Sequence, residues 1–474
     1  MSLPPEAGGD KASCMGRRSE TARSPARPSL FRRKKELPDT ITAAENWSVM
    51  ETQAQQAPPS NWKAKIALFL TGQTISLFGS CLVQYAIVWY ITLTTQSGIM
   101  MMISTLCGFL PQVLISLFAG VWADRYHRKR LIICADTLTA VSTLILAILF
   151  LAGHGSLWLI FLVSGIRSIG QGIQTPAVQA VIPLLVPQDK LMKVNGINGS
   201  VTSMMTLLSP AVSGWLMAVA PLGFIFLIDV ITAVIGISIL SVQRIPLHQK
   251  AREKQKGGYL DDLKAGLRYV KRSGFIRELL IFYAVFFFLL VPAAQMTPLQ
   301  VTRTFGDDVW RLTLVEMLFS IGSVAGGVII AAWGGFRNRI ATIAFACSCF
   351  GFCTALLGIP LNFWVYLAVI LVTGVFVPFF SSALTVLLQE RIQSDMQGRI
   401  FSLLQIVVTA AMPLGMVLFG PLGDAIPIEV LLLATGLLLV LLGGGIYTHK
   451  ALRRAGEPVI QEEPPTGESE AETE

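Results

Sequence analysis

The chain has 474 residues; 53% of them are hydrophobic and only 14% are charged, and the mean hydropathy is +0.62. Soluble globular proteins carry about 25% charged residues, so this composition excludes a soluble domain and indicates membrane-spanning segments. The net charge of +8 could indicate a nucleic-acid partner, but the positions of the basic residues along the chain, described below, argue for a membrane topology signal instead.

The first 60 residues differ in character from the rest. They are polar, rich in Pro and Ala and without a helical hydrophobic period, so we expect a disordered cytoplasmic tail over residues 1–60. They contain no apolar segment typical of a signal peptide. Met50 offers a second start, which leaves the place of residues 1–49 in the native protein open. The basic run at 31–35 fits a solvated tail or a contact with anionic membrane lipid.

Twelve apolar runs follow the tail. A helix needs about 20 mostly apolar residues to cross a bilayer, whereas barrel strands are about ten residues long and alternate in polarity. We therefore predict an all-α membrane protein with twelve transmembrane helices. The predicted spans are residues 64–92, 98–122, 131–151, 157–177, 194–220, 223–242, 276–301, 309–333, 340–359, 363–388, 400–420 and 428–447.

The spans fall into two groups of six. The longest internal connection divides them, and its residues 260–270 have the apolar spacing of a short helix lying on the membrane surface. Pro176 and Pro378 are separated by almost the same offset as Pro210 and Pro413, which indicates duplicated, pseudo-symmetric halves. The predicted organisation is a half at 61–243, a cytoplasmic linker at 244–275, a half at 276–449 and an acidic disordered tail at 450–474.

Basic residues predict the orientation. With the N-terminus in the cytoplasm, all but Arg167, Arg303 and Arg311 of the 37 Lys and Arg residues fall on the cytoplasmic side. This asymmetry is the positive-inside rule. It predicts a multi-pass protein of the cell inner (plasma) membrane with both termini in the cytoplasm.

The loop after the second span carries a motif. Residues 120–130 read Gly-Val-Trp-Ala-Asp-Arg-Tyr-His-Arg-Lys-Arg. This resembles the signature loop Gly-x-x-x-Asp-Arg-x-x-Arg-Lys/Arg of the major facilitator superfamily; an ordinary positive-inside loop is the alternative. The resemblance implies the major facilitator fold and a clamp between the halves in the outward-open state. The gating residues it assigns are Gly120, Asp124, Arg125, Arg128 and Lys129. The matching stretch at 333–339 lacks the acid and should clamp less strongly.

Other segments resemble the macrolide-efflux branch of this superfamily, a drug:proton antiporter group, over about residues 60–450. They are residues 61–63, 84–90, 166–170, 175–177, 183–187, 228–230 and 398–403. Two antiporter motifs, at 167–172 and 209–214, are degenerate. The resemblance implies proton-coupled efflux of amphipathic drug-like molecules such as macrolides, by a monomer. Export of a siderophore or other metabolite, and a non-transporting receptor or scaffold, remain alternatives.

Ionisable residues inside the spans are the candidates for proton coupling. A charge at the bilayer centre costs roughly 2.5 to 3.5 kcal/mol even on the lenient insertion scale, and four residues incur it: Asp136, Arg167, Asp229 and Glu316. The alternatives are an Asp136–Arg167 ion pair on adjacent helices and, for Asp229 and Glu316, positions near the external interface. No histidine lies mid-span to serve as a proton relay.

A mostly apolar cavity with a few polar groups is expected for the substrate. Its candidate residues, each of which could instead face lipid or the protein core, are Gln84, Tyr85, Trp89, Gln112, Tyr283, Phe287 and Gln295. The sequence has no phosphate-binding loop, nucleophile–His pair or metal-ligand spacing. We therefore expect neither an enzyme nor a bound cofactor or metal.

Overall fold

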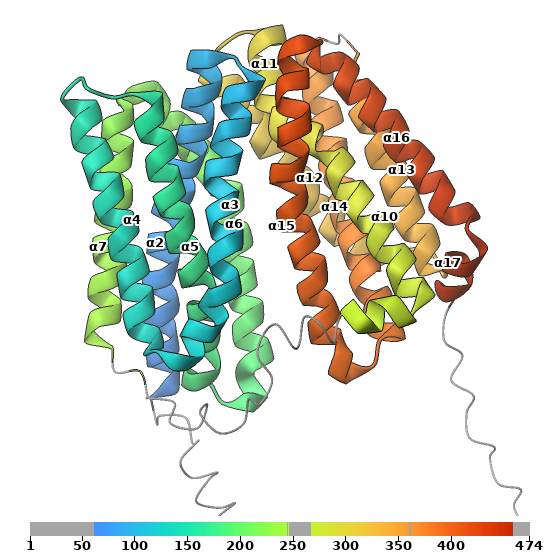
Figure 1. Ribbon diagram of the computed structural model, residues 1–474, viewed down its shortest axis with the longest axis horizontal. Coiled ribbons are helices and arrows are strands. Elements are labelled where there is room, and N and C mark those ends of the chain that lie inside the picture. Colours follow the sequence, from blue (N-terminus) through green and yellow to red (C-terminus); the bar gives the residue numbers. More distant parts are fainter. Residues whose placement is uncertain (1–60, 244, 246–266, 360–361, 458–474) are drawn as a thin grey trace, which may run out of the picture. The chain divides into compact units, whose positions relative to one another are not determined.

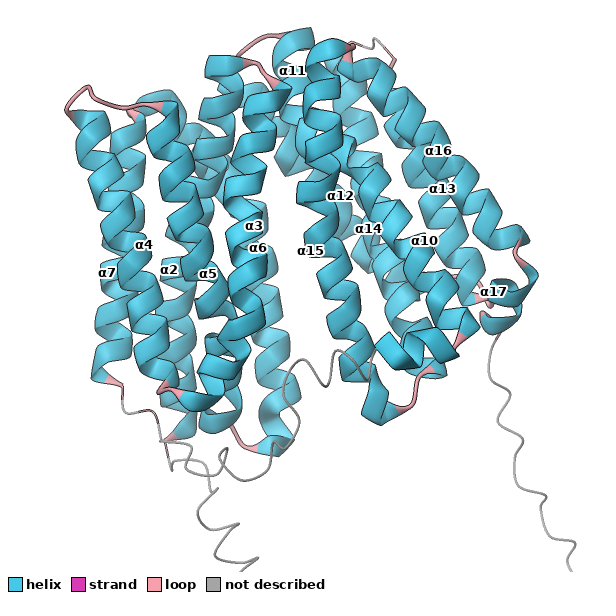
Figure 2. Cartoon of the chain, in the orientation of Figure 1, coloured by secondary structure: helices cyan, strands magenta, loops and turns pink. Residues whose placement is uncertain are grey.

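The computed structural model describes residues 61–243, 245, 267–359 and 362–457. The predicted tail at 1–60, most of the linker with its surface helix at 260–270, and residues 458–474 lie outside this part. Helices make up most of the described chain, and no strand occurs in it (Figure 2). This is the expected outcome for apolar runs in lipid, where each backbone polar group must be satisfied within its own helix.

The first half consists of six long helices, which run from blue to green in Figure 1. A 3₁₀ turn, η1 (Gln188–Lys190), precedes the fifth of them. The helices are α2 (Trp62–Thr95), α3 (Gly98–Arg125), α4 (Arg128–Leu151), α5 (Leu157–Leu185), α6 (Leu191–Val219) and α7 (Leu222–Val242).

The second half repeats this pattern with one interruption. Its first predicted span is not a single α-helix: α10 (Gly274–Val291) passes through a π-helical turn, η2 (Pro292–Met296), into α11 (Thr297–Phe305). The remaining helices are α12 (Val309–Trp333), α13 (Arg339–Leu357), α14 (Phe363–Arg391), α15 (Ser394–Ala425) and α16 (Ile428–Thr448). A short helix, α17 (Lys450–Ala455), follows with Leu452 buried, so this part of the expected C-terminal tail is folded.

Eleven segments of the described chain are long and apolar enough to cross a membrane. The predicted fourth span forms α5, which is not among them, so the count of twelve is not fully confirmed by composition. α5 has the length of its neighbours and packs against α3 and α4. Its polar residues Arg167, Gln171 and Gln174 lower its hydropathy.

The two halves are built alike. In the first, α4 packs against α7 and α3 against α5; in the second, α13 packs against α16 and α12 against α14. The repeated prolines occupy matching helices, with Pro176 in α5 and Pro378 in α14. Pro210 in α6 likewise matches Pro413 in α15. The pseudo-symmetry expected from proline spacing is therefore seen in the packing.

The main contacts between the halves are made by two helix pairs, α3 with α15 and α6 with α12 (Figure 1), and α2 also contacts α11. At the start of α3 the backbones approach so closely that a Cβ on Gly98 would lie 2.3 Å from the carbonyl oxygen of Gly420. A buried cluster nearby combines Trp89 of the first half with Val291 and Met416 of the second. We call this end of the bundle the Asp424 end, and the opposite end, where α4 begins, the Arg128 end.

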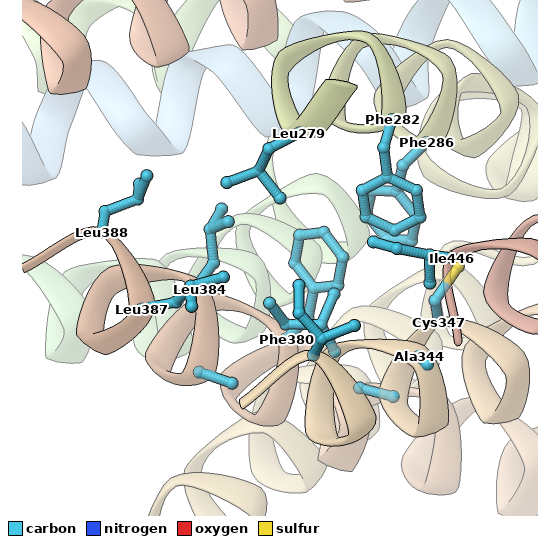
Figure 3. Close-up of a cluster of buried hydrophobic side chains, with 14 of the residues drawn as sticks. Leu279, Phe282, Phe286, Ala344, Cys347, Phe380, Leu384, Leu387, Leu388 and Ile446 are labelled. Atoms are coloured by element: carbon cyan, nitrogen blue, oxygen red, sulfur yellow. The ribbon is translucent and has the colours of Figure 1, made fainter. Parts of the chain in front are cut away.

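Phenylalanine rings lie among the aliphatic side chains in the core of the second half, where α10 meets α13, α14 and α16 (Figure 3). Phe286 and Phe380 stack with ring centroids 4.1 Å apart, and Phe282 lies 6.2 Å from Phe380. Leu279 and Ile446 belong to the same cluster (Figure 3). This packing holds the part of α10 that precedes the π-helical turn against the rest of the second half.

Candidate functional site

Three ionisable side chains are buried together inside the first half. Asp136 on α4 and Arg167 on α5 are each 4% exposed, and Asp229 on α7 is 1% exposed. The three helices converge because α4 packs against both α5 and α7. A Cβ on Gly170 would lie 3.2 Å from the carbonyl oxygen of Ala135, so α4 and α5 touch backbone to backbone beside the charges.

Arg167 and Asp229 form an ion pair, with Nη1 of the guanidinium donating to Oδ2 of the carboxylate. Nη1 also donates to Thr143 Oγ1 at 2.7 Å. On the other side, Ser80 Oγ donates to Asp229 Oδ1 at 3.1 Å. The alternative of an Asp136–Arg167 ion pair is therefore wrong, as is the alternative of an interfacial position for Asp229, which is a buried partner of Arg167.

Asp136 remains without a cation in the part of the chain that the structure describes. Its Oδ2 is buried and accepts no hydrogen bond there. Gln174 interacts with the carboxyl group from α5, and the Asp229 carboxylate is within electrostatic reach. A buried carboxylate that lacks a cation is costly while it is charged, so Asp136 is the member of the cluster whose charge the surroundings balance least.

Glu316 lies apart from this cluster, on α12 of the second half. Its side chain is half-buried, and no described cation pairs with it. The Tyr85 hydroxyl on α2 is close enough to interact electrostatically with it. This electrostatic proximity relates a predicted coupling residue of one half to a predicted cavity residue of the other.

The cavity candidates on α2 have different surroundings. Gln84 is exposed and Tyr85 is half-buried, but Trp89 is fully buried in the cluster that joins the halves. The Tyr85 and Trp89 rings are 5.7 Å apart. Trp89 therefore forms part of the packing at the Asp424 end and does not line an open cavity in this structure. Its placement corrects the prediction for that residue.

The candidates on the other helices are half-buried. Tyr283 and Phe287 on α10 pack together with centroids 4.7 Å apart, and both contact Phe380. Gln295, within the π-helical turn, donates to Met412 Sδ of α15 at 3.7 Å. π-helical turns within α-helices are frequent at functional sites.

Gln112 on α3 contributes through its backbone, whose N–H donates to Ser168 Oγ at 2.9 Å. Its amide side chain is half-buried, as are the aromatic candidates on α10.

The motif loop is described in part. Arg128 Nη1 donates to the carbonyl oxygen of Ala180 at 2.7 Å, and Lys129 Nζ donates to the carbonyl oxygens of Ser241 and Gln243, each at 2.7 Å. These two basic residues thus bind carbonyl groups near the ends of α5 and α7. The surroundings of Gly120 and the side chains of Asp124 and Arg125 lie outside the described part, and the clamping role of these residues stays a prediction.

Several polar residues of the site were not singled out from the sequence. Ser80, Thr143 and Gln174 complete the buried cluster, and each is a polar residue inside an apolar run. The sequence signal that could have found them is a polar residue within a predicted span. This signal is ambiguous, because hydroxyl groups in membrane helices also donate to carbonyl oxygens of their own helix. Thr143 does so, donating to the carbonyl oxygen of Thr139 at 2.9 Å.

Comparison with known proteins identifies the family. A family model described as Major Facilitator Superfamily matches residues 68–416. The chain belongs to the Major Facilitator Superfamily. It is accordingly a multi-pass membrane transporter and not an enzyme, and the predicted all-helical fold of two halves is confirmed.

Relatives within the superfamily agree with the predicted branch. The chain is 30% identical to macrolide efflux protein A of Streptococcus pyogenes over 383 residues, which cover 80% of this chain and 95% of the relative. It is 23% identical to the staphyloferrin A transporter of Staphylococcus aureus, with 75% and 89% covered. A crystal structure of a bacterial homologue of the iron transporter ferroportin, in an inward-facing state, has a TM-score of 0.60. That structure is 16% identical, covers 81% of this chain and 99% of its own, and supports the fold alone.

Proposed function

We propose that this transporter exports amphipathic drug-like molecules of the macrolide kind in exchange for protons. The likeness to macrolide efflux protein A supports the substrate class. The observation that carries proton exchange is Asp136, a buried acid with one carboxylate oxygen lacking a partner in the described structure. Export runs from the Arg128 end, which we assign to the cytoplasm, toward the Asp424 end.

Asp136 and Glu316 are the proton carriers in this proposal. Each lacks a cationic partner among the described residues, so its charge depends on access to water, which alternates as the halves move. Arg167 stays protonated throughout. It is paired with Asp229, whose carboxylate is within electrostatic reach of Asp136, and it does not carry the proton itself.

The substrate surface that we propose lies between the halves. Tyr85 interacts with Glu316 from the opposite half, which would place a proton-carrying acid within reach of a bound molecule. Tyr283 and Phe287 offer aromatic surface, and Gln295 offers an amide. A large apolar ring with several oxygen atoms needs this mixture of surfaces.

Transport by purified protein in lipid vesicles tests the coupling. We expect Asp136→Asn and Glu316→Gln to abolish accumulation of a labelled macrolide driven by an imposed pH gradient, while exchange down the macrolide gradient continues. Glu429→Gln is the matched control, because the hydrogen bond described for the Glu429 carboxylate is accepted from Thr304 of the same half. If both variants accumulate macrolide like the parent, Asp136 and Glu316 are structural and the proton route is wrong.

A siderophore is the second candidate substrate, because the chain also resembles the staphyloferrin A transporter. The same vesicles, offered a labelled siderophore and a labelled macrolide, discriminate the two. Gradient-driven accumulation of the siderophore without the macrolide would replace the substrate class and leave the proton route intact.

A further inference from the structure

Asp424, at the end of α15, binds the beginning of α3 in the other half. Its Oδ1 accepts from the backbone N–H of Gly98 at 2.7 Å, and its Oδ2 accepts from the backbone N–H of Ile99 at 2.9 Å. Ser97 Oγ donates to Oδ2 at 2.8 Å. Free N–H groups and a positive partial charge mark the start of a helix, so a carboxylate is well placed there.

Arg303, at the end of α11, also takes part in the contact between Asp424 and the start of α3. Its Nη2 lies 2.8 Å from Asp424 Oδ1, and its Nη1 donates to the carbonyl oxygen of Gly423 at 2.6 Å. Both Nε and Nη2 also donate to the carbonyl oxygen of Gln96 in the first half. Gln96 has a left-handed backbone, with φ of 46°, in the turn between α2 and α3.

Five hydrogen bonds therefore join the halves at this point: three to Asp424 and two from Arg303. Both side chains are about a quarter to a third exposed, so water can replace these bonds when the halves separate. The start of α3 would survive that separation, because Ser97 Oγ also accepts from the N–H of Met100 within its own half. The contact is thus able to break without unfolding the helix.

Among the residues that the structure describes, the pseudo-symmetric seam between α6 and α12 has no equivalent of this contact. Ala220 and Pro221, which carry no charge, follow α6 where Asp424 stands in α15. Asp308, before α12, makes no capping bond through its side chain and pairs with Arg311 of its own half at 3.1 Å. A cap needed only to stabilise helix starts would be expected at both seams, so the one-sided contact indicates a function specific to the α3–α15 seam.

We propose that Asp424 and Arg303 form a latch that keeps the Asp424 end of the transporter closed, and that this end opens only when Asp424 leaves the start of α3. This deepens the proposed function by naming the group that holds the state in which substrate enters from the opposite end. The latch is a positioning device and does not touch substrate.

A distance measurement tests the latch without any substrate. Spin labels at His154→Cys and Ile359→Cys, in protein whose native cysteines are replaced by serine, report the separation of the halves, because both sites are exposed in turns at the Asp424 end. We expect Asp424→Ala, and separately Arg303→Gln, to lower the ratio of short to long distances by about tenfold, the scale of a charge-assisted hydrogen bond.

Two matched controls lie at the same end. Glu429→Gln removes a carboxylate bound to Thr304, and Arg311→Gln removes a guanidinium bound to Asp308, both within the second half. We expect each of these two variants to give the same spin-label distances as the parent protein. If Asp424→Ala and Arg303→Gln also keep the parent's distances, the latch is refuted. Should Asp424→Ala fail to insert, the result for Arg303→Gln decides.

Exchange of the two charges separates a latch on the helix start from a simple ion pair. In Arg303→Asp combined with Asp424→Arg the opposite charges remain, but a guanidinium faces the N–H groups of Gly98 and Ile99. We expect the Asp424 end of the exchanged protein to be open, as in the single variants. Recovery of the short distance would overturn the role given to the start of α3. Because no measurement here involves protons or drug, failure of the latch is distinct from failure of the proposed efflux.

Discussion

The buried charges of the first half differ in how their neighbours compensate them. Arg167 and Asp229 satisfy each other, with Thr143 and Ser80 completing their hydrogen bonds. Asp136 is left with a free oxygen in the described structure. A paired charge and an unpaired one respond differently to mutation, because removal of one member of a buried pair leaves the other without compensation.

Substitution of Arg167 by Met should therefore destabilise the protein by about 3–5 kcal/mol, since it leaves Asp229 charged and alone. Addition of Asp229→Asn to this variant should recover most of the loss. Ser80→Ala removes one hydrogen bond to Asp229 and should cost about 1 kcal/mol. Thermal unfolding in detergent measures all three; a double variant no more stable than Arg167→Met would show that the pair is not the source of the loss.

Because a charge inside the membrane is costly, the ionisable residues within the spans could be identified from the sequence as candidates. The sequence did not show which of them form an ion pair. Asp136, Arg167, Asp229 and Glu316 are all placed in helices, as predicted. The long side chain of Arg167 reaches α7 instead of the acid on its sequence neighbour α4. Such a choice depends on the rotation of each helix in the bundle, which hydropathy does not specify.

At the scale of whole helices, small residues decide how closely elements pack. A Cβ on Gly326 of α12 would lie 2.1 Å from the carbonyl oxygen of Val375 on α14, whereas a Cβ on Gly327 would meet nothing within 4 Å. In lipid, where apolar surface gains little from burial, close backbone approach of this kind drives helix association.

Gly326→Val should force α12 away from α14 and destabilise the second half by about 1–3 kcal/mol. Gly327→Val is the control in the neighbouring position and should leave stability within about 0.5 kcal/mol of the parent. Unfolding temperatures of the two purified variants provide the comparison. Equal losses in both would mean that valine acts through helix propensity and not through contact with α14.

The elements themselves were largely predictable, because each apolar run has the length of a span. Two departures have local causes. The run at 276–301 contains Pro292, which lacks an N–H group, and the helix there passes into the π-helical turn before α11. The run at 157–177 is predicted as a span on length, but its polar residues serve the buried cluster and reduce its hydropathy. The length of an apolar run predicts neither the π-helical turn nor the buried polar cluster.

For the whole molecule, orientation remains to be measured. Tyr126 is exposed at the Arg128 end and Asp307 is exposed at the Asp424 end. In intact cells an impermeant thiol reagent should label Asp307→Cys and not Tyr126→Cys, because basic residues place the Arg128 end in the cytoplasm. Permeabilised cells, in which both sites should react, provide the control. Labelling of Tyr126→Cys from outside would reverse the orientation and the direction of transport.

α3 and α15, one of the helix pairs that join the halves, carry an acid at each end of their seam. Asp124 stands near the end of α3, and Asp424 near the end of α15. The motif resemblance assigns Asp124 to closure of the Arg128 end, while the contacts of Asp424 close the other end. Asp124→Asn should then shift the population toward the state that Asp424 holds closed, and Asp424→Ala should shift it the opposite way.

The double variant distinguishes two independent locks from a single one. Because the acids act on different states from opposite ends of the seam, their effects on the ratio of the states should add, and Asp124→Asn with Asp424→Ala should return close to the parent's distribution. Interconversion should be faster, since both states have lost a stabilising contact. Spin-label distances at His154→Cys and Ile359→Cys give the ratio, and single-molecule fluorescence at the same sites gives the rate. A double variant that behaves like Asp424→Ala alone would assign the whole balance between states to the Asp424 latch and would remove Asp124 from gating.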